Sequence, residues 1–189
     1  MKNPSEELEI NNTERKAFLS AKDITTTAMM VAMIEACKIV LAAIPNVELT
    51  SFLIILFTLH FRKRILYVIP TFILIEGAMY GFGLWWIMYL YGWPLLALVT
   101  WLFRNMKSPV SWAILSGIFG LCFGALCSIP YFVIGTISEG IKGGLATGFA
   151  WWIAGIPFDL THGIANFVIM LVLYHPVNNV LTKCEKRFA

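Results

Sequence analysis

The stretch from Ile65 to Phe103 limits the possible folds more than any other feature of the sequence, because it holds a single charged residue, Glu76. A membrane-spanning helix needs about 20 apolar residues, so this stretch is too long for one crossing and must fold back. The glycines of Gly81–Gly83 permit such a turn, since glycine adopts backbone conformations that other residues avoid. We therefore predict one span over residues 65–80 and another over residues 84–103.

The composition extends this prediction to the whole chain. Of the 189 residues, 59% are hydrophobic and only 13% are charged, which indicates a membrane protein with several spans and no sizeable soluble domain. The predicted fold class is all-α, a bundle of six transmembrane helices. We expect the other four spans at residues 24–44, 49–61, 110–134 and 157–181, with a loop at 138–144 and a short outer segment at 145–154 before Pro157, which suits the first turn of a helix.

The basic residues predict the orientation of this bundle. In the six-span arrangement only Lys142 lies on the outer side, and a strong excess of Lys and Arg marks the cytoplasmic side. Both termini are therefore predicted to be cytoplasmic, as a tail over residues 1–21 and another over 183–189, with the membrane domain at 22–182. The residues on the predicted inner side are Lys2, Arg15, Lys16, Lys22, Arg62, Lys63, Arg64, Arg104, Lys107, Lys183, Lys186 and Arg187.

The sequence contains no motif of a known catalytic or metal centre. It has no GxxxxGK[ST] phosphate loop, no GxSxG and no HExxH, so we expect no catalytic residue, metal or cofactor in this chain. An intramembrane hydrolase that uses Ser116 or Ser128 with His162 is a weak alternative. The four cysteines form no CxxC, and we interpret them as packing residues.

Three polar residues in the last span are the strongest functional signal. Asp159, His162 and Asn166 are spaced by three and four residues, so they share one face of a helix. Ionisable groups at membrane depth are costly, and they usually mark a binding or transport site. Glu35 and Lys38 in the first span are three residues apart, and they can neutralise each other.

Further polar and aromatic residues are expected in the same outer half of the bundle. No comparable line of carboxylates continues to the cytoplasmic side, which favours a pocket closed below over a channel. Aromatic faces stack on flat rings and hold cations, although Trp and Tyr also anchor helices at membrane interfaces, and Glu76 can form a structural pair with Lys38. The candidate substrate-binding residues are Lys38, Glu76, Tyr80, Trp85, Trp86, Tyr89, Trp151, Trp152, Asp159, His162 and Asn166.

Four stretches together resemble a known family. They are the alanine stripe Ala28, Ala32 and Ala36 in the first span and the segments Pro45–Thr50, Tyr80–Trp86 and Gly155–His162. Over residues 22–182 the chain resembles the substrate-binding S component of energy-coupling factor (ECF) vitamin transporters of bacterial cell membranes.

The resemblance implies a function without catalysis in this chain. Such proteins bind a vitamin or precursor from outside with the first loop, here around Asn46, and with the outer ends of later spans. Their alanine stripe, here Ala28, Ala32 and Ala36, docks on a transmembrane coupling protein that carries two cytosolic ATPases. Relatives specific for thiamine use tryptophans, a Glu, a His and an Asn, to which Glu76, Trp151, His162 and Asn166 correspond by position.

Two other classes remain open. A proton-coupled secondary transporter of a small polar or aromatic solute can relay protons through residues such as Glu35, Glu76, Asp159 and His162, but such carriers usually contain an internal repeat, and none is visible. A purely structural subunit leaves Asp159 and His162 unexplained. The ligand itself is not given by the sequence: thiamine or its pyrimidine part, a pyridoxine-like ring, riboflavin and a larger corrinoid all suit an aromatic pocket.

Overall fold

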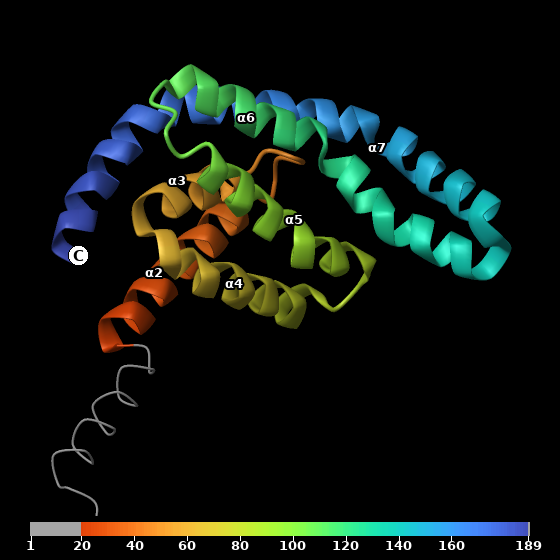
Figure 1. Cartoon of the computed structure of the whole chain (residues 1–189), viewed down its shortest axis with the longest axis horizontal. Coiled ribbons are helices and arrows are strands. Elements are labelled where there is room, and N and C mark those ends of the chain that lie inside the picture. The colour runs from red at the N-terminus through yellow and green to blue at the C-terminus, as the bar shows by residue number, and fades with distance from the viewer. Residues whose placement is uncertain (1–19, 189) are drawn as a thin grey trace, which may run out of the picture.

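The computed structural model describes residues 20–188 and is all-helical over that part of the chain, as predicted. Among the described residues, helices long and apolar enough to cross a membrane occur at Ala21–Leu41, Leu84–Leu102 and Pro109–Glu185. The tail predicted at residues 1–21 lies almost wholly outside the described part. The elements are α2 (Ala21–Leu41), α3 (Thr50–Phe61), the 3-10 turn η1 (Arg62–Arg64), α4 (Ile65–Tyr80), α5 (Leu84–Leu102), α6 (Pro109–Leu121) and α7 (Phe123–Phe188), arranged as in Figure 1.

The start of α2 is tied to the turn between α3 and α4. Ser20 and Asp23 form a capping box, in which the Asp23 backbone N–H donates to the Ser20 hydroxyl at 3.1 Å. Arg64 Nε donates in turn to Asp23 Oδ1 at 2.8 Å. These contacts bring the first turn of α2 and the basic turn η1 to the same end of the molecule.

The reversal predicted between residues 80 and 84 is confirmed. Helix α4 ends at Tyr80 and α5 begins at Leu84, while Gly81 has a φ of 90°, a value that glycine tolerates and other residues rarely adopt. The indole N–H of Trp86 donates to the carbonyl oxygen of Ile73 at 2.7 Å and joins the two helices. Helix α3 lies in the interior, with Phe52 through Phe57 almost fully buried.

The last third of the chain differs from the predicted spans. Helix α6 ends at Leu121, so the predicted span 110–134 is interrupted before α7 begins. The predicted loop at 138–144 is only the single non-helical residue Gly140, with φ 75° and ψ −178°. The break expected at 155–157 is wrong, and so is the separate segment 145–154: helix continues through both. An unbroken helix satisfies its own backbone groups, which matters most where water is scarce.

Gly140 divides α7 into two limbs, residues 123–139 and 141–188, that pack closely through glycines. A Cβ at Gly120 of α6 would lie 2.8 Å from Gly163 Cα, and one at Gly148 would lie 2.9 Å from Phe132 Cβ. Only glycine leaves room for backbones at these distances. Figure 1 shows the second limb of α7 running back along the first limb and then along α6, at one edge of the molecule.

Gly140→Ala should destabilise the protein by about 1–3 kcal/mol, because its φ and ψ belong to a region that is essentially restricted to glycine. Gly155→Ala is the matched control. Gly155 is helical and a Cβ there meets no atom within 4 Å, so the change should be neutral or stabilise by about 0.5–1 kcal/mol. Thermal unfolding of the detergent-purified variants measures both effects. Equal stability of the two variants would contradict the role given to Gly140.

Candidate binding site

The loop at residues 42–49, between α2 and α3, contacts α7 through an ionisable pair. His162 Nε2 lies 3.0 Å from Glu48 Oε1, and the Ser51 hydroxyl donates to the same oxygen at 2.9 Å. Burial raises the pKa of the Glu48 carboxyl, but the hydrogen bond and charge of His162 and the Ser51 hydroxyl outweigh it, so the pKa lies below its ordinary value. Glu48 is therefore held as a carboxylate that joins the loop to α7.

The polar face predicted on the last span is confirmed. Asp159, His162 and Asn166 are all buried on α7. Asp159 Oδ1 accepts a hydrogen bond from the backbone N–H of Gly124 at 2.8 Å, and the edge of the Phe123 ring packs on His162 with centroids 4.7 Å apart. Glycine at 124 leaves room for the Asp159 carboxylate, since a Cβ there would overlap with it.

Several polar atoms on this face have no hydrogen-bond partner within the described part of the chain. They are Asp159 Oδ2 and both amide atoms of Asn166, whose side chain is only 1% exposed. Buried polar groups are almost always satisfied in folded proteins, and exceptions call for an explanation such as a ligand or water. These atoms therefore retain unused hydrogen-bonding capacity, which a ligand or a buried water can satisfy.

Lys38 of α2 forms an ion pair with Glu76 of α4, and not with its neighbour Glu35. The ammonium group contacts Glu76 Oε2 and lies 5.4 Å from the centroid of the Tyr89 ring and 5.3 Å from that of Phe72. The Glu35 carboxyl is close enough to interact electrostatically with both Lys38 and Glu76. The expectation that Glu35 and Lys38 simply neutralise each other is thus incomplete, because Glu76 takes the direct contact.

A continuous row of aromatic rings connects the Lys38–Glu76 pair with His162. The row begins at Tyr89, whose ring lies under Lys38. The Tyr89 and Trp93 ring centroids are 5.3 Å apart, and those of Trp93 and Phe123 are 5.7 Å apart. Phe123 in turn packs on His162. Tyr89 also interacts electrostatically with Glu48 and Glu76. The Lys38–Glu76 pair and the polar face of α7 therefore belong to one largely buried group of side chains, which we call the polar chamber. It consists of Glu35, Lys38, Glu48, Glu76, Tyr89, Trp93, Phe123, Asp159, His162 and Asn166.

Three predicted residues at the turn between α4 and α5 lie at the edge of the polar chamber. Trp85 packs edge-on against Tyr89 with centroids 5.2 Å apart. Trp86 uses its indole N–H for the bond to Ile73 and therefore serves the packing of α5 on α4. Tyr80 is exposed, and its ring centroid lies 6.0 Å from Lys38 Nζ.

The structure does not bring Trp151 and Trp152 to the polar chamber. Both are exposed, and Trp151 stacks on Tyr131 of the other α7 limb at 3.8 Å between centroids. Because α7 is continuous through residue 155, Trp151 lies eight residues from Asp159 on the same helix, which is about 12 Å along the axis. The predicted substrate role of these tryptophans depended on a break in α7 that is absent, and their exposure suits interfacial anchoring.

Sequence reasoning missed Glu48 and Trp93 as site residues. Glu48 follows Asn46, a predicted site residue that has a φ of 58° and lies in the same loop. The available signal was a lone carboxylate between two apolar spans. Trp93 carried no signal, because a tryptophan in an apolar run is equally compatible with the interior and with the lipid interface.

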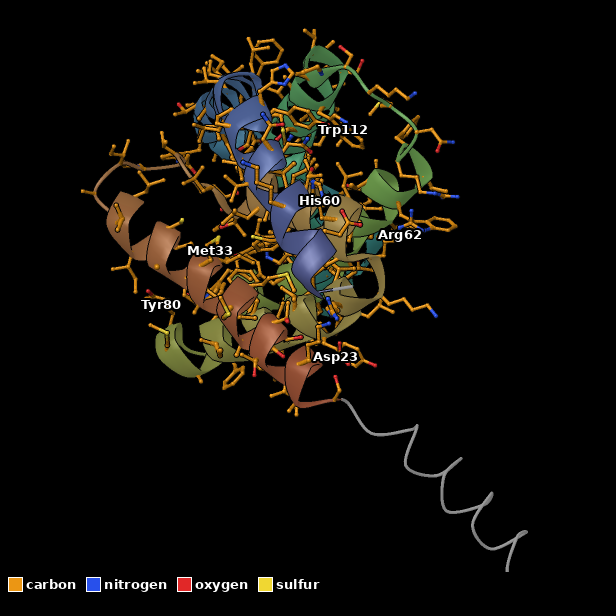
Figure 2. All side chains as sticks on the ribbon, turned by 90° about the vertical axis from the view of Figure 1, so that its left-hand side faces the viewer. Asp23, Met33, His60, Arg62, Tyr80 and Trp112 are labelled. Atoms are coloured by element: carbon orange, nitrogen blue, oxygen red, sulfur yellow. The ribbon has the colours of Figure 1, made fainter. Side chains whose placement is uncertain are left out.

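The predicted docking stripe lies on the outside of the molecule. Ala28, Ala32 and Ala36 are all exposed along α2, together with Met29 and Met33; Figure 2 labels Met33 on this helix. Within residues 20–188, the stripe is therefore not used for packing of the helices against one another.

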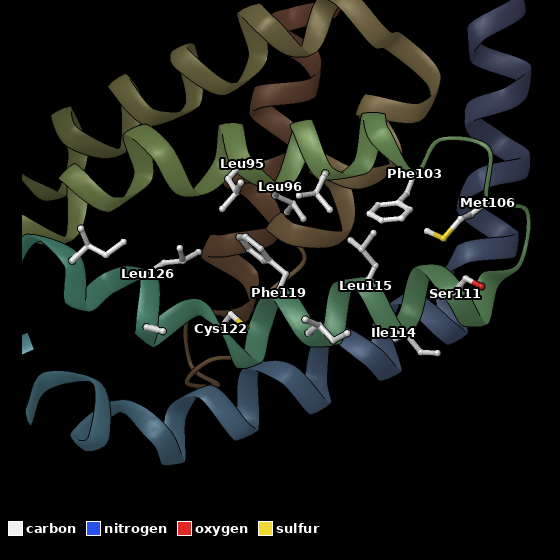
Figure 3. Close-up of a pocket in the computed structure, with 14 residues that line it drawn as sticks. Leu95, Leu96, Phe103, Met106, Ser111, Ile114, Leu115, Phe119, Cys122 and Leu126 are labelled. Atoms are coloured by element: carbon white, nitrogen blue, oxygen red, sulfur yellow. The ribbon is translucent and has the colours of Figure 1, made fainter. Parts of the chain in front are cut away.

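A groove elsewhere in the molecule has a different character. It has a volume of about 710 Å³ and runs between α5, α6 and the start of α7, where it is lined by apolar residues such as Leu95, Ile114 and Phe119 (Figure 3). No charged residue lines this groove. It offers no means of recognising a polar ligand.

Comparisons with known proteins add no identification. No protein-family model matches this chain, and neither the curated proteins nor the solved structures give a match.

The ion pair between Lys38 and Glu76 provides a test of the chamber. Lys38→Met leaves the buried Glu76 without its cation, and breaking a buried pair from one side costs up to about 3–5 kcal/mol. The double variant Lys38→Met/Glu76→Gln removes both charges and should recover at least half of that loss. A double-mutant cycle on thermal unfolding measures the coupling, and purely additive losses would show that the pair contributes nothing as a unit.

Proposed function

We propose that this chain is the substrate-binding S component of an ECF-type transporter, and that it binds a small heterocyclic vitamin or vitamin precursor. One observation carries the proposal: a loop carboxylate, a buried ion pair and a polar helix face converge on a row of aromatic rings. The residues come from α2, α4, α5, α7 and the loop at 42–49. Such convergence of distant segments on one buried polar region is typical of a ligand site.

The proposed membrane topology has six crossings and both termini in the cytoplasm. The crossings are α2, α3, α4, α5, α6 with the first limb of α7, and the second limb of α7. Two contacts support a shared cytoplasmic end: Arg64 with Asp23, and His60 Nδ1 with Glu185 at 3.0 Å. They join the start of α2, the end of α3 and the last turns of α7, where Lys and Arg are also concentrated.

The charges of the polar chamber indicate the chemistry of its ligand. In the described part of the chain, this region contains four carboxyl groups, one ammonium group, that of Lys38, and one imidazole, that of His162. The carboxyl groups belong to Glu35, Glu48, Glu76 and Asp159. An excess of carboxyl groups favours a ligand with a positive charge or several hydrogen-bond donors. The rings of Tyr89 and Trp93 favour a flat ring. A heterocycle with an amino group or a cationic ring nitrogen combines both features.

The loop at 42–49 is proposed to cover the bound ligand. Its Glu48 is attached to His162, a residue of the polar face itself. A ligand that contacts His162 must therefore compete with the loop or be enclosed by it. Ligand binding and loop closure are coupled in this proposal, as in sites that exclude water by closing a loop.

A proton-coupled carrier is the second candidate, because Glu35 lies in electrostatic contact with the pair of Glu76 and Lys38. Clusters of ionisable groups of this kind relay protons in some carriers. Uptake that requires ATP but no proton gradient would support the S component, and the reverse dependence would support the carrier.

Asp159→Asn combined with His162→Ala should weaken ligand binding at least tenfold, about 1.4 kcal/mol, because it removes two polar groups of the chamber. Native mass spectrometry of the purified chain first identifies the bound molecule, with thiamine, pyridoxine and riboflavin as added probes, and titration calorimetry then measures affinity. His175→Ala is the control, since His175 is exposed on the same helix. Unchanged affinity in the double variant would move the site away from α7.

Replacing Ala28 and Ala32 with Trp should abolish uptake in cells and leave ligand binding intact. The two alanines are exposed and belong to no contact of the polar chamber, while a bulky residue blocks close helix approach. Co-purification with a coupling protein and ATPases, compared between wild type and variant, measures docking directly. Loss of ligand binding in this variant would contradict the docking role.

A further inference from the structure

The end of the bundle opposite the polar chamber contains a polar pocket. Glu48 and Ser51 lie at the start of α3, whereas this pocket lies at its other end, around His60 and Arg62, both labelled in Figure 2. The pocket has a volume of about 230 Å³. The residues that matter for its chemistry are Thr58, His60, Arg62, Trp101, Arg104 and Asn178.

An apolar groove adjoins this pocket and shares Thr58, Arg62 and Trp101 with it. The groove lies between α4 and α5, has a volume of about 530 Å³ and is lined along its length by apolar residues such as Leu66, Ile69, Pro70, Pro94 and Leu98. A polar pocket with basic residues thus continues directly into an apolar groove between α4 and α5, whose lining residues Leu66 and Leu98 are exposed.

Within the part of the chain whose side chains are described, no carboxylate forms an ion pair with Arg62 or Arg104. Arg104 donates to the Trp101 carbonyl at 3.0 Å and lies 4.5 Å from the centroid of the Trp101 ring. Glu185 is paired with His60, whose other ring nitrogen lies 2.9 Å from Asn178 Oδ1. The described residues that line the pocket therefore carry a net positive charge.

The backbone at Arg62 supports a role for its side chain. Its φ of 38° lies in the region that favours glycine, at the point where the chain turns from α3 into α4. An arginine at such a position is strained, and strained residues concentrate at functional sites. The side chain at this strained position, that of Arg62, lines both the pocket and the groove.

We propose that the pocket and the groove together bind one anionic phospholipid. The guanidinium groups of Arg62 and Arg104 contact the phosphate, for which arginine has a matching geometry. One acyl chain lies in the groove between α4 and α5, and Trp101 lies at the level of the headgroup, where tryptophan is common. The anionic leaflet on the cytoplasmic side supplies such lipids. This site does not depend on the function proposed for the polar chamber.

Native mass spectrometry of the purified full chain tests this site, with phosphatidylglycerol and phosphatidylcholine of identical acyl chains as probes. We expect one phosphatidylglycerol per protein and at least tenfold less retained phosphatidylcholine. Arg62→Gln with Arg104→Gln should lower phosphatidylglycerol retention at least tenfold. Lys107→Gln should not, because Lys107 is a neighbouring basic residue that lines neither pocket nor groove.

Arg62→Gly separates loss of binding from loss of folding. Glycine relieves the strained backbone at this position, so the variant should unfold at the same temperature or higher while it retains less phosphatidylglycerol. Equal retention of both lipids, an equal loss in Lys107→Gln, or full retention in Arg62→Gly would overturn the proposal. Displacement of the lipid by millimolar inorganic phosphate alone would also overturn it, because the site would then recognise a free anion.

Discussion

Burial of charge among apolar helices is the condition on which the rest of this structure depends. A charged group inside an apolar bundle is costly unless another group of the protein compensates it. Lys38 and Glu76 compensate each other between α2 and α4, and Glu48 and His162 do so between the first loop and α7. These two contacts join segments that lie far apart in the sequence, so the polar chamber and the packing of the helices have a common origin.

The two ends of the bundle have opposite electrostatic character. The polar chamber contains more carboxyl groups than cations, whereas the end formed by η1, the last turn of α5 and the end of α7 contains mainly Lys and Arg. This division suits a protein with a site for a donor-rich or cationic ring at one face and contact with anionic lipid at the other. The apolar groove between α5 and α6 contains none of the charged residues of either site.

Local patterns were sufficient for part of the fold. The helices α4 and α5 and the turn between them follow from an uncharged stretch and a pair of glycines, and the face of Asp159, His162 and Asn166 follows from helical periodicity. The continuous course of α7 could not be predicted from local patterns. Pro157 after Gly155 is a common start of a helix, but the same residues are tolerated inside a membrane helix when the neighbouring backbone keeps its hydrogen bonds.

The sequence by itself determined the all-helical class, the reversal after Tyr80 and the identity of the ionisable residues in apolar surroundings, because these depend on composition and on spacing within one helix. Tertiary structure alone decided which of these residues meet. Lys38 contacts Glu76 and not Glu35, and Glu48 reaches His162, because pairing across 38 and 114 residues is set by helix packing. The position of Trp151 outside the chamber has the same cause, since a continuous α7 extends past the other helices to its turn at Gly140.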